Sequence, residues 1–152
     1  MAKKTYNEKL NDSKNMPEVQ MVPPEAAARY GGPRMLIAQP LAYNAIMAQV
    51  PRGKIITTDK MREHLAKQHK ANWTCPLTCG IFVNICANAA EERKDKNLPY
   101  WRTVKAGGEL CEKFPCGIDG QKMLLEMEGH KIIQKGKRYL VENYEKKLHE
   151  IK

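Results

Sequence analysis

The residues whose types could carry chemistry stand together at Pro99-Tyr100-Trp101-Arg102. Two large aromatic side chains beside an arginine could form a ring-lined pocket next to a cation and hold a flat ligand such as a nucleobase. The competing interpretation is that both rings are ordinary packing residues at the start of a strand. The sequence predicts this strand over 101–105, a tight turn at Ala106-Gly107-Gly108-Glu109 and a return strand from Leu110, because glycine reaches positive φ at little steric cost.

Cysteines are the other residues with potential reactivity. The chain has five, and an odd number without an export signal argues against a disulfide framework. Cys75, Cys79, Cys111 and Cys116 could bind zinc as a tetrahedral set. Neither pair has the Cys-x-x-Cys spacing, however, and we interpret them as small buried residues. The sequence therefore predicts no metal and no cofactor.

The charge of the chain indicates its class of partner. Its 152 residues include 26 Lys and Arg against 17 Asp and Glu, a net charge of +9. This excess favours a polyanion, with nucleic acid first and an acidic membrane surface second. No apolar segment approaches the length of a membrane span. The basic N-terminus has no apolar signal region, so we expect a cytoplasmic protein without a membrane partner.

The elements that must position these residues divide the chain into two parts. Residues 1–34 have prolines and glycines at a density that prevents long elements, so we expect a largely irregular N-terminal arm. One or two helical turns could form at 25–30. Residues 35–152 are expected to form a single domain, which a buried, alanine-rich helix over 41–50 enters.

The middle of the chain has the outline of two helices followed by β structure. A short strand at 54–57 precedes a helix that Thr58 or Asp59 caps and that runs to about Lys70, with Met61 and Leu65 facing inward. A second helix is expected to start near 74–76 and run to about Glu92. This order is typical of a winged helix-turn-helix, in which the second helix enters a DNA groove. The alternative is a core helix without a DNA role.

The C-terminal third predicts a helix over 119–128 that Gly129 stops. A strand, a basic turn and a second strand follow over 132–141. A short terminal helix is then expected over 144–151, with Leu148 facing inward.

An ordered set of motifs resembles the O6-alkylguanine-DNA alkyltransferase family. Pro99 to Arg102 sits where that family carries Pro-Cys-His-Arg. The similarity covers about residues 36 to 130 and includes Val50 to Thr58, Gly108-Glu109-Leu110 and Glu128-Gly129-His130. Tyr100 occupies the place of the acceptor cysteine and Trp101 that of the activating histidine. The chain therefore resembles the alkyltransferase-like subgroup, which lacks the reactive cysteine.

The resemblance implies an α+β, mostly helical fold and two groups of site residues. The implied lesion pocket consists of Tyr100, Trp101, Arg102 and Glu128, with Glu128 as a hydrogen-bond partner of the Trp101 indole. The implied DNA contacts are Lys54, Thr57, Thr58, Lys60, Arg62, Thr74, Leu77, Thr78 and Lys105. Leu77 takes the place of the arginine that fills the gap left by an extruded nucleotide, and an apolar wedge can also unstack a base step. Either Asn84 or Asn88 could replace the family's asparagine.

The expected function is non-enzymatic. Alkyl transfer needs a thiolate beside a base, whereas Tyr100 offers a phenol with an ordinary pKa near ~10. The first hypothesis is a monomeric protein that binds double-stranded DNA, senses O6-alkylguanine and marks it for repair proteins. The second is a general DNA-binding or regulatory winged-helix protein. The third is a protein-interaction or small-ligand module on a retired alkyltransferase scaffold.

Overall fold

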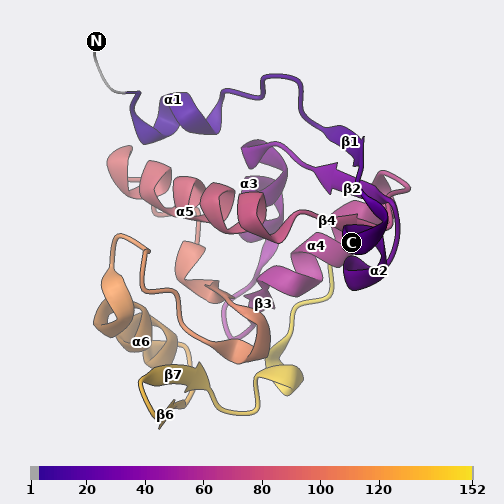
Figure 1. Cartoon of the computed structure of the whole chain (residues 1–152). Helices are drawn as coiled ribbons and strands as arrows, with labels where there is room; N and C mark the ends of the chain where they lie inside the picture. The colour runs from indigo at the N-terminus through magenta and orange to yellow at the C-terminus, as the bar shows by residue number, and fades with distance from the viewer. Residues whose placement is uncertain (1–3, 152) are drawn as a thin grey trace.

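A computed structural model describes residues 4–151. These residues form an α+β fold in which helices predominate and the sheets are small, as the sequence predicts (Figure 1). The α-helices are α1 (Tyr6–Leu10), α2 (Pro24–Tyr30), α3 (Pro40–Gln49), α4 (Thr58–Gln68), α5 (Pro76–Glu92) and α6 (Gly117–Met127). The strands are β1 (Glu18–Met21), β2 (Arg34–Ile37), β3 (Ile56–Thr57), β4 (Trp73–Thr74), β5 (Thr103–Val104), β6 (Ile132–Lys135) and β7 (Arg138–Val141). Short 3-10 turns are η1 (Tyr100–Arg102), η2 (Ala106–Gly108) and η3 (Tyr144–Lys147).

The N-terminal segment is more ordered than the sequence predicts. β1 pairs antiparallel with β2, and β2 pairs parallel with β4. α1 lies along α5 (Figure 1), where the Glu92 carboxylate accepts hydrogen bonds from the backbone N–H groups of Tyr6 and Asn7. The expectation of a largely irregular arm is therefore wrong for this segment. Its short elements are stabilised by partners far along the chain, which local composition does not reveal.

The two central helices agree with the sequence analysis. α4 and α5 are joined through β4, and Met61 and Leu65 of α4 are buried in the main core with the inner face of α5. The N-cap of α4 is Thr57, so the prediction of Thr58 or Asp59 as the cap is wrong. α5 begins with Pro76 in its first turn, where a missing N–H costs nothing.

The chain after α5 departs from the predicted hairpin. Tyr100–Arg102 is a 3-10 turn, and β5 pairs parallel with β3. The glycine turn does form, because Gly107 and Gly108 have φ values of 81° and 85°. However, Glu109 bridges to Leu140 on β7. No strand returns along β5, because the segment after the glycine turn pairs with β7, where the Leu110 N–H donates to the Tyr139 carbonyl at 2.9 Å.

The C-terminal part encloses a second, smaller core. Val104, Leu110, Leu125 and Val141 are buried there, beneath α6 and the antiparallel β6–β7 pair, which forms as predicted. α6 starts at Gly117 rather than at 119. The terminal helix is only the 3-10 turn η3 over Tyr144–Lys147, because Ile55 takes the backbone of the following residues into a parallel bridge. Among residues 4–151, no helix combines the length and apolar character that a membrane span requires.

Candidate nucleic-acid interface

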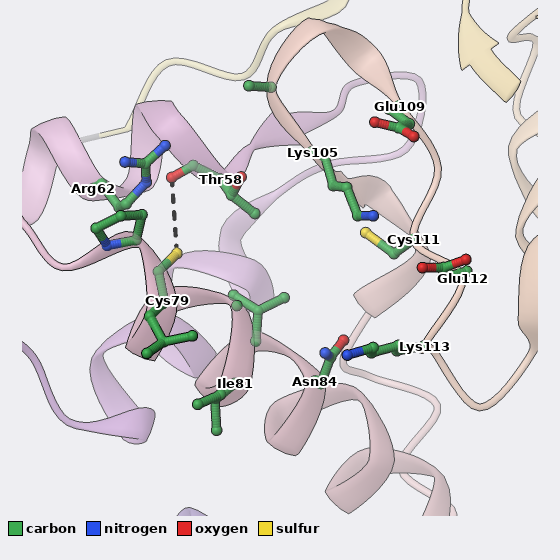
Figure 2. Close-up of a pocket in the computed structure, with 15 residues that line it drawn as sticks. Thr58, Arg62, Cys79, Ile81, Asn84, Lys105, Glu109, Cys111, Glu112 and Lys113 are labelled. Atoms are coloured by element: carbon green, nitrogen blue, oxygen red, sulfur yellow. Dashed lines mark hydrogen bonds between the residues drawn. The ribbon is translucent and has the colours of Figure 1, made fainter. Parts of the chain in front are cut away.

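A surface cavity of about 550 Å³ lies between the first half of α5, the adjoining face of α4 and the segment 105–113 (Figure 2). The helices contribute Thr58, Arg62, Pro76, Leu77, Cys79, Gly80, Ile81, Val83 and Asn84, and the segment contributes Lys105, Ala106, Glu109, Cys111, Glu112 and Lys113. We call this cavity the α5 cavity. Its size is in the range of small-ligand sites and accommodates a single nucleobase.

One wall of the cavity is an exposed apolar edge of α5. The spacing Leu77, Ile81 and Asn84 puts these residues on one face of a helix. Leu77 is 72% exposed and Ile81 is 48% exposed. Both side chains therefore leave much of their apolar surface uncovered by the described part of the chain. They are available to a partner that offers an apolar or stacking surface.

The opposite walls are charged. Arg62 reaches the cavity from α4, and Lys105 and Lys113 reach it from the segment 105–113 (Figure 2). Among the described residues none of these three cations forms an ion pair within 4.0 Å. Glu109 and Glu112 also line the cavity, so the cations exceed the carboxylates by one. A partner that carries negative charge around an apolar or aromatic centre matches this arrangement.

Two thiols border the cavity without being activated. Cys79 and Cys111 are 1% and 4% exposed. Burial raises the pKa of Cys79 to about 11 and that of Cys111 to about 12. Both thiols are therefore protonated near neutral pH, where only the thiolate is a nucleophile. No cluster of three or more His, Cys, Asp or Glu side chains suited to a metal ion is present among residues 4–151.

The residues expected to contact DNA divide into three groups. Thr58, Arg62, Leu77 and Lys105 line the α5 cavity. Thr57 and Thr74 are buried at 1% and 2% exposure, so the prediction that they contact DNA does not fit this surface. Both sit on short strands whose neighbours cover them, and the Thr74 hydroxyl donates to the Arg62 carbonyl at 2.8 Å.

The third group lies outside the cavity. Lys54 and Lys60 are exposed, and Lys60 forms a 3.5 Å ion pair with Glu63 on its own helix. The Thr78 hydroxyl donates to the Cys75 carbonyl at 3.4 Å, within the first turn of α5. None of these three residues is part of the cavity wall.

The aromatic pair lies away from the α5 cavity. Tyr100 is only 5% exposed, and its ring packs edge-on against Trp101 and Phe114, with centroids 5.6 Å apart in each case. Its hydroxyl donates to Glu91 at 3.1 Å, and burial raises the pKa of this phenol. Tyr100 and Trp101 border a separate cavity of about 510 Å³ together with Leu124. The packing interpretation of these rings is therefore the one that the structure favours.

Arg102 and Glu128 engage each other. The Arg102 guanidinium donates to both Glu128 oxygens, with contacts of 2.9, 3.2 and 2.6 Å, and to the Val50 carbonyl at 2.7 Å. Burial raises the pKa of Glu128, but the hydrogen bonds and charge of Arg102 outweigh it and hold that pKa below its ordinary value. The expected bond from the Trp101 indole to Glu128 does not meet hydrogen-bond geometry. The stronger, bidentate donor takes the carboxylate instead.

Sequence reasoning missed several cavity residues. Ile81 follows Leu77 at helical spacing, so the periodicity of α5 contained the signal. Of the two asparagines that the sequence offered, Asn84 lines the cavity, whereas Asn88 lies further along the same helical stripe and donates to the Asn84 carbonyl. Lys113 had no such signal, because only the path of the chain after the glycine turn brings it to α5.

Comparisons with known proteins give one structural likeness. No family model matches the chain, and no curated protein matches it. Among solved structures, that of S. pombe Atl1 in complex with damaged DNA containing O6-carboxymethylguanine is similar at 20% sequence identity. The similarity covers 72% of this chain and 91% of that chain, with a TM-score of 0.48.

Proposed function

We propose that this chain is a non-enzymatic protein that binds double-stranded DNA through the α5 cavity and its rim. The observation that carries the proposal is Leu77, which is 72% exposed at the start of α5 and lines the same cavity as the cations Arg62 and Lys105. DNA supplies the matching chemistry, because its phosphates take the cations and its base stack accepts an apolar wedge. The net charge of +9 acts in the same direction at longer range.

The finer proposal is that the protein senses O6-alkylguanine. In this reading Leu77 enters the base stack and the displaced base occupies the α5 cavity, whose volume is about 550 Å³. An alkyl group on O6 would meet the apolar wall formed by Val83 and Ile81. Without an activated thiol the base is held and not repaired, as in the alkyltransferase-like proteins that the sequence resembles.

The alternative of a small-ligand module has one observation in its favour. The separate cavity beside Tyr100 and Trp101 has a volume of about 510 Å³, and Ala90 and Leu124 join the two rings in its apolar part. That part suits the apolar portion of a small ligand. The rest of the wall is charged and comes from residues 91–96. DNA remains the better candidate for the chain as a whole, since the two lysines and two carboxylates of this cavity balance and leave no excess of cations there.

The experiment is a titration of one short duplex that carries O6-methylguanine and of its unmodified twin, each at two salt concentrations. Leu77→Ala is expected to remove the preference for the lesion, a change of about 10-fold or more if the wedge contributes at least ~1.4 kcal/mol. Lys105→Ala is expected to weaken both duplexes alike and to reduce the salt slope by about one. Leu41→Ala is the matched control, since Leu41 is also exposed, at 39%, but lies on α3.

Three outcomes are informative. Lesion preference that Leu77→Ala alone removes supports lesion sensing. Equal and salt-dependent binding of both duplexes supports a general DNA-binding protein and rejects lesion sensing. No binding of either duplex at low salt rejects the DNA proposal, and the cavity beside Tyr100 then becomes the site to pursue.

A further inference from the structure

A second cavity adjoins the α5 cavity at Arg62, which lines both. It has a volume of about 310 Å³ and lies between α4, the end of α2 and β4. Tyr30 and Trp73 form one wall, with stacked rings whose centroids are 4.5 Å apart and whose planes differ by 21°. We call this pair the aromatic platform. Tyr30 belongs to the N-terminal segment that the sequence analysis treated as an arm.

The platform is held in place although Tyr30 is 41% exposed. The Trp73 indole donates to the Gly32 carbonyl at 2.8 Å, and the Asn72 amide oxygen accepts from the Arg34 N–H at 2.9 Å. Gly32 has a φ of +152°, and a Cβ atom there would lie 2.3 Å from the Asn72 side chain. Only glycine fits this close approach. The loop after α2 is thus tied to β4, next to Tyr30 at the end of α2. Trp73 covers one face of the Tyr30 ring, and the Arg29 guanidinium over the ring, 5.3 Å from its centroid, is the group that an incoming base would replace.

The charges around the platform select the part of a nucleotide that fits. Arg62 and Lys67 line this cavity, but so do Asp59 and Glu63. With equal numbers of cations and carboxylates, the cavity does not attract a phosphate into its interior. A nucleobase suits it better, because its face stacks on an aromatic ring and its N–H groups donate to carboxylates. The attached phosphate can remain outside, near Arg62 at the border with the α5 cavity.

We propose that the aromatic platform is a second subsite, which binds one unpaired nucleobase of a strand whose duplex part lies on the α5 cavity. This inference rests on the proposed function, since Arg62 joins the two sites. It gives the N-terminal segment a binding role. It also predicts that DNA with single-stranded character beside the duplex binds more tightly than a blunt duplex.

The test compares a blunt duplex with the same duplex that carries short thymine tails at both ends, by fluorescence anisotropy with the full chain. The wild type should bind the tailed duplex more tightly. Tyr30→Ala should remove this advantage, a loss of about 5- to 150-fold, which corresponds to stacking of one base at ~1–3 kcal/mol. Tyr30→Phe keeps the ring and should retain it. Binding of the blunt duplex should be unchanged in both variants, which also shows that they fold.

Tyr6→Ala is the matched control. Tyr6 is 40% exposed on α1 with Lys9 over its ring at 5.1 Å, and Tyr30 is 41% exposed with Arg29 at 5.3 Å. Loss of the tail advantage in Tyr30→Ala alone supports the subsite. No tail advantage in the wild type, or an equal loss in Tyr6→Ala, overturns it and leaves the duplex interface standing. No binding of the blunt duplex by any protein, while the tailed duplex still binds, would overturn the proposed function instead.

Discussion

The ion pair between Arg102 and Glu128 permits a test of whether these residues hold the fold together or serve DNA. The two side chains are 14% and 5% exposed. The Arg102 guanidinium donates three hydrogen bonds of 2.6 to 3.2 Å to the Glu128 carboxylate. Glu128→Gln would leave the Arg102 charge buried and without its counter-charge. Breaking a buried pair in this way costs ~3–5 kcal/mol. Because glutamine keeps one acceptor, we expect a loss of about 2 to 4 kcal/mol in the free energy of unfolding.

The assay is urea unfolding followed by circular dichroism, with Glu142→Gln as the control. Glu142 pairs with Lys131 at 3.7 Å, and their side chains are 39% and 75% exposed. An exposed pair contributes at most about 1 kcal/mol, so Glu142→Gln should have little effect. If Glu128→Gln is no more destabilising than this control, the reasoning from burial and bidentate geometry is refuted.

The stabilisation by Glu128 is also expected to depend on pH in a defined direction. The pKa of Glu128 is lower in the folded protein than its ordinary value, so its contribution is fully present above that ordinary value. It is lost as the pH falls through the lower pKa of the folded state. The stability difference between the wild type and Glu128→Gln should therefore be constant near neutral pH and shrink in acid. A difference that grows in acid would contradict the assignment.

Two further predictions concern the support and the chemistry of the α5 cavity. Gln121 is fully buried; its side-chain oxygen accepts from the Cys111 N–H, and its amide nitrogen donates to two carbonyls of the segment 101–103. Gln121→Leu leaves these three backbone groups without a partner, at ~1–3 kcal/mol for each group. We therefore expect the free energy of unfolding, measured in urea, to fall by about 3 kcal/mol or more. Native-state alkylation read by mass spectrometry should modify the half-buried Cys75 before the buried Cys79. The Cys79 rate should rise about tenfold per pH unit towards its pKa of about 11, and rapid labelling at neutral pH would contradict the assignment of a protonated thiol.

The sequence by itself determined the features that depend on neighbours along the chain. The burial of α3 follows from its apolar, alanine-rich composition, and the buried face of α4 follows from apolar spacing. The turn at Gly107 and Gly108 follows from the need for positive φ. The β6–β7 pair follows from two short strands around a glycine turn. The helical period also predicts that Leu77, Ile81 and Asn84 lie on one face of α5.

Only the tertiary structure decided which distant segments meet. It pairs β5 with β3 instead of with a returning strand. It also gives Glu128 to Arg102, brings Lys113 to the α5 cavity and stacks Tyr30 on Trp73. Hydrogen-bonding edges and charged groups have several partners of suitable chemistry along the chain, and local sequence does not rank them. The choice is made by packing of the whole chain, where each buried donor must find an acceptor within hydrogen-bond distance.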